Sequence, residues 1–325
     1  MILVTGATGF LGKHLVELLL ARGDNVRVLA RGDGPSGVET LRGDVTDPND
    51  VNRAVSGVRA IYHLAGIVSR DPAGEAIMRR VHVEGTRLIC EAALRCNVER
   101  VVVASSSGTI AVSPDPVEWD ESAGYKSETV ARWPYYVTKI EQEKLALAFA
   151  RDRGLPLVVI NPSLLLGPGD DRNSSTGDVR RFLEGQVLSV PVGGLSMVDV
   201  RDCAAGAVLA MERGRPGERY LFGAVNWTMT RFLAELAGIT GGAAPRMKSP
   251  AWLGLLTAPM LRSLMPLLGR KFDFDDESIR MSALFWYLDS AKARRELGFV
   301  TRDPRETLRA TIDDLRRRSL PGSIA

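Results

Sequence analysis

The stretch MILVTGATGFLGKHLVELLLA, residues 1–21, decides the fold. A short apolar run, Ile2–Thr5, is followed by Gly6, Gly9 and Gly12, and apolar residues then recur at helical spacing as far as Ala21. Glycines at a strand-to-helix turn allow a tight bend and let backbone N–H groups approach a phosphate, whose charge the helix N-terminus favours. The stretch predicts a strand, a phosphate-binding turn and a helix, and therefore a nucleotide site.

The same alternation continues through the first half of the chain. Short runs rich in Val and Ile are separated by longer segments with helical periodicity. Uninterrupted apolar strands are buried on both faces, which is typical of a parallel sheet between two helix layers. We therefore predict a doubly wound α/β fold with strands at Ile2–Thr5, Val26–Ala30, Ala60–Leu64, Val101–Ser105 and Leu157–Asn161, and helices at Phe10–Ala21, Pro48–Val55, Ala76–Leu94 and Tyr135–Arg153.

The second half of the chain has a different sequence pattern. After about residue 165 the alternation weakens and Gly/Pro-rich loops such as GPGDDRNSSTGD become frequent. We predict a dinucleotide-binding domain at residues 1–165. Residues 166–325 are expected to form a smaller mixed lobe that binds substrate, with some elements returning to the first domain. In such folds ligands bind at the carboxyl edge of the sheet.

Composition limits the classes of function. The chain has 325 residues, 25% of them charged, and a net charge of +3, which is too small to indicate a nucleic-acid partner. Three cysteines without metal spacing indicate a reducing compartment, and three scattered histidines do not suggest a zinc site. The N-terminus lacks the basic flank of a signal peptide. We expect a cytoplasmic protein without a bound metal.

One apolar segment, residues 251–269, resembles a membrane helix in composition. It contains Pro259, Pro266 and a central Arg262, so a spanning helix is not expected. We predict a pair of short apolar helices that cap a pocket. Peripheral contact with a membrane surface is the alternative.

The residue that follows the second strand bears on the cofactor. A free ribose 2′-OH calls for an acidic residue about 20 positions beyond the glycines. Ala30 and Arg31 stand there instead, and Arg31 can pair with a 2′-phosphate, so NADP(H) is preferred over NAD(H). Asp33 keeps NAD(H) open, since a small loop shift would bring it to the ribose.

A tyrosine and a lysine stand four positions apart in PYYVTKIEQEK, residues 134–144. Helical spacing makes Tyr135 and Lys139 neighbours on one face. The spacing alone fits a catalytic pair or two side chains that merely share that face.

Taken with the other motifs, this pair gives the chain a specific resemblance. The chain resembles the extended short-chain dehydrogenase/reductase family over nearly its whole length, closest to the branch of dihydroflavonol reductases and hydroxysteroid dehydrogenases. The motifs occur in the family's order: TGATGFLG, GDVTDP (43–48), HLAG (63–66), VEGT (83–86), SSSGT (105–109), YYVTK, NPSLLLGPGD (161–170), VDVRD (198–202) and YLDSAKARRELGF (287–299).

The resemblance implies a serine, tyrosine and lysine mechanism. Tyr135 is the acid–base residue, and a lysine ammonium one turn away favours the phenolate and lowers the tyrosine pKa. Lys139 also holds the nicotinamide ribose. The serine is Ser106 in the reductase alignment, which we prefer, and Ser107 in the epimerase alignment. Tyr136 is expected to pack.

The predicted cofactor site follows the same motifs. Small residues at a strand end, Ala65 and Gly66, let a flat ligand lie against the backbone, and Pro162 shapes a wall beside the nicotinamide. His82 replaces the asparagine that the family often has, so it joins a proton relay or simply packs. The full predicted set is Gly6, Thr8, Gly9, Phe10, Leu11, Gly12, Arg31, Asp44, Val45, Leu64, Ala65, Gly66, Tyr135, Lys139, Pro162 and Ser163.

Three functions fit these residues. The first, which we prefer, is an NADP(H)-dependent reductase or dehydrogenase that interconverts a ketone and a secondary alcohol on an apolar or bulky small molecule. The second is an NAD-dependent nucleotide-sugar epimerase or dehydratase, which needs cations for a diphosphate. The third is a non-catalytic NADP(H) sensor or scaffold. Candidate cations for the second are Arg172, Arg180, Arg181 and Arg246.

The expected partners are a small-molecule substrate and a second copy of the chain. The predicted helices Ala76–Leu94 and Tyr135–Arg153 resemble those that pair across a family dimer. Their apolar stripes could also be fully used inside one subunit.

Overall fold

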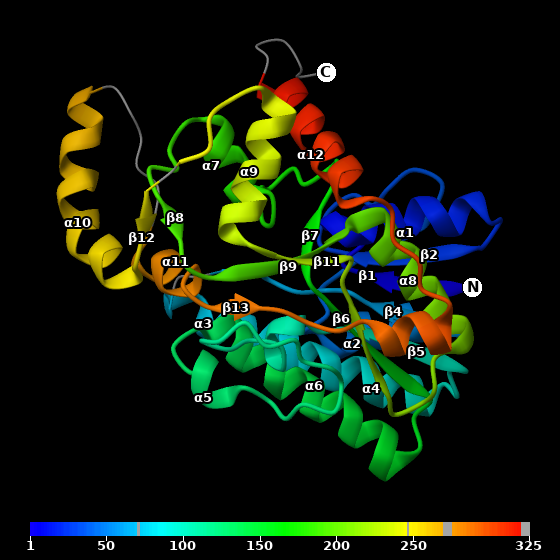
Figure 1. Cartoon of the computed structure of the whole chain (residues 1–325). Coiled ribbons are helices and arrows are strands. Elements are labelled where there is room, and N and C mark those ends of the chain that lie inside the picture. Colours follow the sequence, from blue (N-terminus) through cyan, green and yellow to red (C-terminus); the bar gives the residue numbers. More distant parts are fainter. Residues whose placement is uncertain (70–71, 246, 269–274, 320–325) are drawn as a thin grey trace.

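Figure 1 shows the computed structural model of the chain, which describes residues 1–69, 72–245, 247–268 and 275–319. Its centre is a seven-stranded sheet in which every strand pairs in parallel with its neighbours. In spatial order the strands are β10 (Arg219–Phe222), β6 (Leu157–Pro162), β5 (Arg100–Ala104), β4 (Ala60–His63), β1 (Ile2–Thr5), β2 (Val26–Ala30) and β3 (Glu39–Arg42).

Helices cover both faces of this sheet, because its strands are apolar on both sides. One face packs on α1 (Phe10–Ala21) and α8 (Val200–Arg213). The other face packs on α2 (Pro48–Val55), α4 (Gly85–Arg95) and α6 (Pro134–Arg153). The predicted doubly wound α/β fold is confirmed, and the five predicted strands and three of the four helices agree with the structure to within a residue.

The predicted helix Ala76–Leu94 is wrong as a single α-helix. The chain forms α3 (Glu75–Arg79), one turn of π-helix, η2 (Arg80–Glu84), and then α4. The buried residues in and beside this turn, Met78, Val81, His82 and Gly85, still follow one another at steps of three or four, so periodicity does not reveal it. Strand β10 was also not predicted, because it lies far along the chain, beyond the first strands of the second lobe.

The second lobe is built around a smaller sheet with β9 (Gly194–Asp199) at its centre. Strands β7 (Leu164–Leu166) and β13 (Phe285–Trp286) pair with β9 in parallel, and β11 (Val225–Thr228) pairs with it antiparallel. A separate apolar core lies against α7 (Gly177–Leu183), α9 (Met229–Thr240) and α12 (Pro304–Ser319). The remaining short elements are α5 (Ser127–Val130), β8 (Val190–Pro191), β12 (Lys248–Ser249), α11 (Asp276–Met281) and the π-helical turn η5 (Ala293–Leu297).

The two parts of the chain are interleaved. Strand β10 follows the first strands of the second lobe and yet completes the main sheet beside β6. Helix α8 likewise packs Cys203, Ala204 and Ala207 into the core beneath the main sheet. The main sheet therefore needs residues as far along the chain as Phe222.

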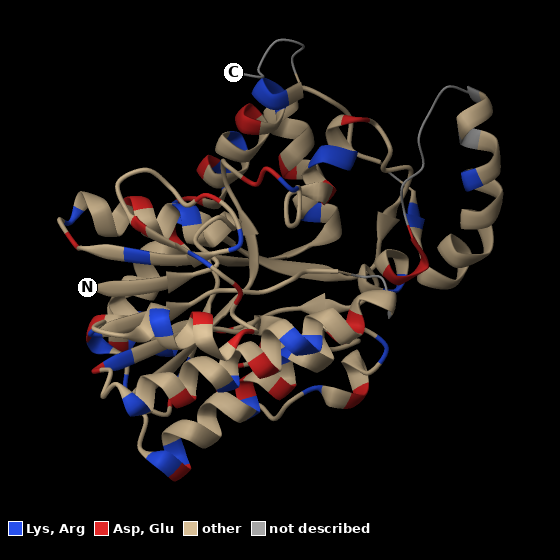
Figure 2. Cartoon of the chain, turned by 180° about the vertical axis from the view of Figure 1, so that it is seen from behind, with Lys and Arg blue, Asp and Glu red and all other residues tan. Residues whose placement is uncertain are grey.

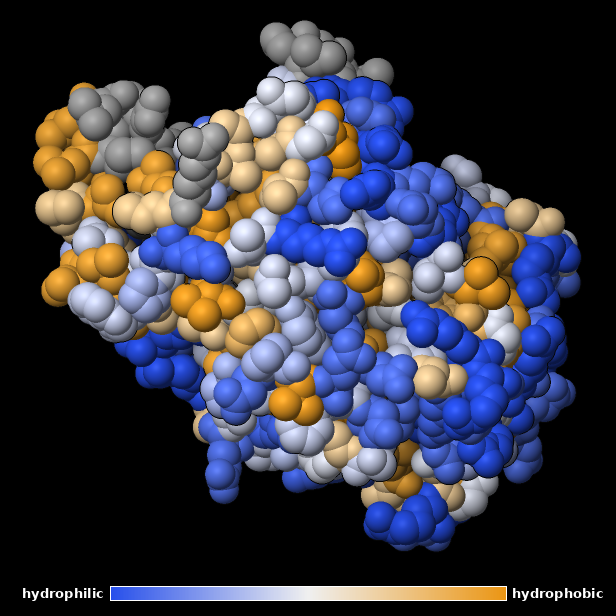
Figure 3. Space-filling model, viewed as in Figure 1, coloured by the Kyte–Doolittle hydropathy of each residue, from blue (hydrophilic) through white to orange (hydrophobic). Residues whose placement is uncertain are grey.

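Helix α10 (Ala251–Leu264) stands apart from the rest of the second lobe (Figure 1). It contains Pro259 and continues into a 3₁₀ turn, η4 (Met265–Leu268); the last residue of the predicted apolar segment, 269, lies outside the described residues. Trp252 is 66% exposed and Leu256 is 71% exposed, and hydrophobic atoms gather over this helix in Figure 3. None of the described helices is long and apolar enough to cross a membrane.

Residues of both charges are mixed along the helices, as the view from behind shows (Figure 2). Many form ion pairs one helical turn apart, such as Arg87 with Glu91. Pairs of this kind at the surface contribute little to stability.

Candidate active site

A cavity of about 1250 Å³ lies between the carboxyl edge of the main sheet and the second lobe. It reaches from the glycine-rich turn after β1 to the inner face of α10. Most of the predicted site residues line it, among them Gly6, Thr8, Gly9, Phe10, Leu11, Gly12, Arg31, Leu64, Gly66, Ser106, Ser107, Tyr135, Lys139, Pro162 and Ser163. Asp44, Val45 and Ala65 are not part of this lining.

The glycine-rich turn has the close backbone approach that the sequence predicts. Gly6 has φ of +74°, and a Cβ there would lie 2.7 Å from the backbone N of Ala65. A Cβ on Gly12 would lie 2.1 Å from the carbonyl oxygen of Gly6. No larger residue fits either position, and α1 begins directly after Gly9 with its free N–H groups at the cavity. This donor set fits the pyrophosphate of a dinucleotide.

The loop after β2 offers one cation and one carboxylate. Arg31 is exposed and lines the cavity. Asp33 forms an ion pair with Arg42, and both side chains are largely exposed. Asp44 accepts hydrogen bonds from the backbone N–H and the hydroxyl of Thr46, both at 2.9 Å. Arg31 and Asp33 were the alternative contacts predicted for the adenosine ribose, and of these two Arg31 lines the cavity.

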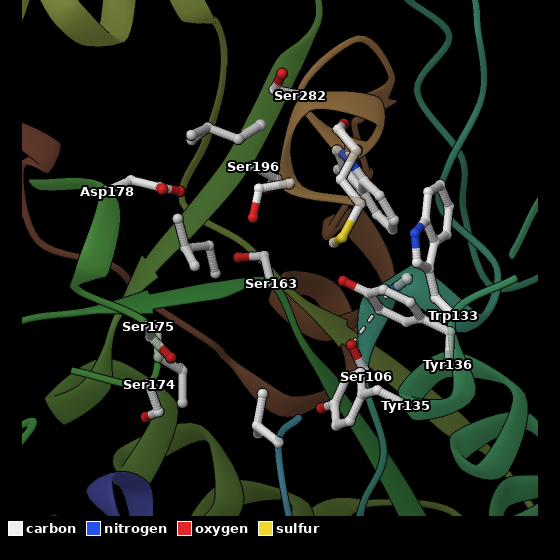
Figure 4. Close-up of a pocket in the computed structure, with 18 of the residues that line it drawn as sticks. Ser106, Trp133, Tyr135, Tyr136, Ser163, Ser174, Ser175, Asp178, Ser196 and Ser282 are labelled. Carbon is white, nitrogen blue, oxygen red and sulfur yellow. Dashed lines mark hydrogen bonds between the residues drawn. The ribbon is translucent and has the colours of Figure 1, made fainter. Parts of the chain in front are cut away.

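Tyr135 and Ser106 face each other at the cavity wall (Figure 4). Burial raises the pKa of Tyr135 to about 12, and a hydrogen bond with Ser106 acts in the opposite direction. The backbone N–H of Gly108 donates to the Ser106 hydroxyl at 3.4 Å. Ser107 also lines the cavity and is 5% exposed. The contact with Tyr135 favours Ser106 over Ser107.

Lys139 lies one turn after Tyr135 on α6 and is only 5% exposed. Its ammonium donates to the carbonyl oxygen of Ala104 at 2.8 Å and to the side-chain oxygen of Gln142 at 2.9 Å. Burial lowers the pKa of Lys139 to about 7, and the charge of Glu143 raises it. In this arrangement burial, rather than the lysine charge, dominates the pKa of Tyr135. The pKa of Tyr135 is therefore raised, whereas the charge of the lysine alone was predicted to lower it.

Glu143 lies a further turn along α6, is fully buried, and organises the loop after β5. Its carboxylate accepts hydrogen bonds from Ser105 at 2.5 Å and from Asn161 at 2.7 Å. It also forms an ion pair with Arg219 of β10 at 3.0 Å. The same Asn161 amide donates to the carbonyl oxygen of Ser106 at 3.1 Å. Glu143 thereby joins three strands to the segment that carries Ser106.

His82, in the π-helical turn, is fully buried beside the pair. The backbone N–H of Ile67 donates to its Nε2 at 3.0 Å, so Nδ1 carries the proton and donates to Thr138 at 2.9 Å. Burial lowers the pKa of His82 to about 2. Its ring stands edge-on to Tyr135, with centroids 5.9 Å apart. Both nitrogens of this neutral imidazole are hydrogen-bonded to the protein. Of the two roles expected for His82, the structure therefore favours packing over a proton relay.

A second buried histidine belongs to the same polar layer. His63, at the end of β4, bonds to Thr5 at 2.8 Å and to Thr86 at 3.0 Å. Gln142 donates to Thr86 at 2.8 Å and so links the layer to Lys139. Burial lowers the pKa of His63 to about 3, so this histidine is also neutral.

Aromatic side chains form the cavity wall next to Tyr135. Tyr136 stacks on Trp286 with ring centroids 5.0 Å apart, and Trp133 lies 6.0 Å from Trp286. The indole N–H groups already donate to Glu277 and to the carbonyl oxygen of Met281. The Tyr136 ring can pack this closely against residue 108 because that residue is glycine, since a Cβ there would lie 2.3 Å from the ring. Aromatic surface is therefore what this wall presents.

Glu143, Arg219 and this aromatic wall were not predicted from the sequence. Glu143 follows Tyr135 and Lys139 at the next four-residue step, so helical spacing places all three on one face. That spacing could have identified Glu143 from the sequence. Nothing local marks Arg219 or Trp286, because only the tertiary fold brings them to the cavity.

Two of the four cations predicted for a diphosphate are engaged elsewhere. Arg180 pairs with Glu184, and Arg181 pairs with Asp178. Arg172 is exposed and lines the cavity, whereas Arg246 lies outside the described residues. The described residues also contain no cluster of His, Cys, Asp and Glu that could hold a metal ion.

Comparisons with known proteins agree with this geometry. The model of the NAD dependent epimerase/dehydratase family matches residues 2–223. A protein of Synechocystis sp. named "Putative dihydroflavonol 4-reductase" is 34% identical over 96% of this chain and 92% of its own length. Sterol demethylase protein B of Methylococcus capsulatus is 34% identical over 98% of this chain and 99% of its own. Among solved structures, gox2253 has a TM-score of 0.84, with 29% identity over 98% of both chains.

Proposed function

The chain belongs to the NAD dependent epimerase/dehydratase family, and from that premise we propose that it is an NADP(H)-dependent reductase that interconverts a ketone and a secondary alcohol. The predicted resemblance to extended short-chain dehydrogenases is confirmed, as is the assignment to NAD(P)-dependent oxidoreductases. The proposal adds the class of substrate, the preferred cofactor and the residues that act.

One observation carries the proposal. Ser106, Tyr135 and Lys139 come together at the junction of two kinds of cavity wall. On one side lies the glycine-rich turn that fits a dinucleotide. On the other lie the aromatic rings and the inner face of α10, including Leu253 and Leu261. An acid–base pair between a cofactor cradle and an apolar chamber suits reduction of a bulky apolar ketone.

The cofactor supplies the hydride when it is bound. Tyr135 donates a proton to the oxygen of the substrate, and Ser106 holds that oxygen by a hydrogen bond. Lys139, in its protonated form, stabilises the phenolate that Tyr135 leaves behind and binds the cofactor ribose. The charge of Glu143 favours the protonated form of Lys139, and its hydrogen bonds fix the loop of Ser106. The apolar chamber excludes water from the reacting group.

Arg31 supports NADP(H) as the cofactor. It is exposed at the cavity, where a 2′-phosphate would extend from the adenosine ribose. Asp33 is engaged with Arg42, which reduces its availability to a ribose 2′-OH. Pro162 and the backbone of Ser163, which also line the cavity, are the proposed wall beside the nicotinamide.

An epimerase or dehydratase with retained NAD is the second candidate. The name of the family and the cavity-facing Arg172 favour it. A sensor without catalysis would have no use for the contact between Tyr135 and Ser106 at the cavity.

The test begins with purified protein that is denatured to release any nucleotide, which mass spectrometry identifies. We expect an empty site or substoichiometric NADP, followed by oxidation of NADPH that depends on an added bulky ketone. Stoichiometric NAD together with no ketone-dependent oxidation would instead support the epimerase.

We also propose a cytoplasmic homodimer that pairs through α3, α4 and α6. Ile77 on α3 is 46% exposed, which leaves apolar surface on that face. Light scattering of the purified protein measures the mass, and a monomer of 35.3 kDa would contradict the dimer.

A further inference from the structure

We propose that Ser163 and Ser196 form a polar anchor that binds a second oxygen of the substrate. The substrate is then a bulky, largely apolar ketone that carries a further hydroxyl or carbonyl group. This inference rests on the proposed reductase function and specifies the chemistry of its substrate.

The backbone places the two serines side by side. Strand β7 begins directly after Ser163, and its first residue, Leu164, pairs with Met197 of β9. Ser163 and Ser196 each stand one residue before that pair, so they lie at the same level of two parallel strands. Such strands are about 4.8 Å apart, and residues in register point to the same face. Both serines line the cavity.

Both hydroxyls lack a hydrogen-bonding partner among the described residues. Ser163 is 7% exposed and Ser196 is 2% exposed, so bulk solvent does not satisfy them. Their backbones are already engaged, since Ser163 N–H donates to Phe222 at 2.9 Å and Ser196 pairs with Asn226 across the β9–β11 ladder. Buried polar groups without partners are rare in folded proteins, and each one calls for an explanation.

A ligand in the adjoining cavity supplies that explanation. A serine hydroxyl reaches a new partner by turning about a single side-chain bond. In Figure 4 the hydroxyls of Ser163 and Ser196 lie near each other, and the Tyr136 hydroxyl points toward this pair. Since a hydroxyl both donates and accepts, the two serines suit either a hydroxyl or a carbonyl oxygen.

The surroundings make this anchor selective. Trp133, Tyr136 and Trp286 form an aromatic wall, and α10 adds Leu253 and Leu261. A substrate without the second oxygen leaves both hydroxyls desolvated and unpaired. Sites built to bond a substrate hydroxyl discriminate strongly against analogues that lack it.

The experiment compares α-tetralone with its derivatives that carry one hydroxyl on the saturated ring. We expect the wild-type protein with NADPH to reduce the best hydroxylated ketone with a kcat/KM at least about tenfold above that of the parent. Ser196→Ala and Ser163→Ala should each bring this ratio to within about threefold. Because the ratio is taken within one variant, any change in cofactor binding cancels. Ser282→Ala is the matched control, since that serine lines the same cavity but its hydroxyl already donates to Ile279 at 2.7 Å.

Calorimetric titration separates the anchor from the reaction. In a Tyr135→Phe background with NADPH present, the hydroxylated ketone should bind more tightly than the parent, and Ser196→Ala should remove the difference. If the selectivity of binding is present but no ketone is reduced by the wild type, the anchor stands and the reductase assignment falls. If ketones are reduced with a ratio that neither serine variant changes, or if no hydroxylated ketone is preferred, the anchor is overturned while the reductase assignment stands.

Discussion

Glu143 of α6 and Arg219 of β10 form an ion pair at 3.0 Å in which the carboxylate is fully buried. The pair lies one turn beyond Lys139 and connects the catalytic helix to the far edge of the main sheet. A buried carboxylate is tolerated because its oxygens are paired and hydrogen-bonded. In this protein the same carboxylate raises the pKa of Lys139, which burial otherwise lowers.

Glu143→Gln should shift the pH dependence of activity. Lysine is charged below its pKa, and the pKa of Lys139 is about 7 with the Glu143 charge in place. Without that charge the pKa falls further, so the alkaline limb of kcat/KM should move to lower pH. A profile between about pH 5 and pH 9 measures it. Glu141→Gln is the control, because Glu141 pairs with Arg79 at the surface. A limb that stays in place or moves upward would refute the role of Glu143.

Tyr135→Phe should lower kcat by about a thousandfold and leave NADPH binding near normal, because only the proton donor is lost. Tyr136→Phe is the matched variant. Its ring keeps the stacking on Trp286, so kcat should change by no more than about threefold. Steady-state kinetics with titration of NADPH measures both effects. Equal losses in the two variants would show that the acid–base assignment is mistaken.

Arg31→Ala should raise the KM for NADPH by about tenfold or more and leave the KM for NADH nearly unchanged, since it removes a charge-assisted contact with the 2′-phosphate. Asp33→Asn provides the comparison. If Asp33 binds a ribose 2′-OH, that variant raises the KM for NADH instead, and the preference for NADP(H) is wrong.

The two buried histidines should make stability depend on pH. The pKa is about 3 for His63 and about 2 for His82, and both are lowered by burial, whereas an unfolded histidine titrates near 6.5. The unfolded chain therefore binds more protons below about pH 6.5, and the free energy of unfolding falls as pH decreases toward these values. His82→Asn should reduce this slope by about 1.4 kcal/mol per pH unit.

Urea unfolding at several values below about pH 6.5 measures that slope. Thr138→Val is the control for His82→Asn, because it removes the same hydrogen bond but no titrating group. It should lower the stability at every pH without changing the slope. An unaltered slope in His82→Asn would show that His82 is not held neutral in the folded protein.

The sequence predicts the parts of this fold that depend on local pattern. Ile2–Thr5 and Phe10–Ala21 are found as expected, since apolar runs and glycine positions record burial and turn geometry directly. The π-helical turn escaped prediction because it hardly changes the apolar spacing around His82. The proximity of Ser163 and Ser196 was not predicted either. Such register between distant strands is set by tertiary packing and has no local signature.

The interleaved path of the chain has a consequence for biosynthesis. Residues 1–165, while emerging from the ribosome, still lack α8, whose Cys203, Ala204 and Ala207 cover one face of the main sheet. Arg219 is also missing, so the carboxylate of Glu143 is without its counter-ion. The nascent nucleotide-binding half is therefore exposed and incomplete until Phe222 has been made. We expect both halves to fold in one cooperative transition, which delays ligand capture until the substrate chamber exists.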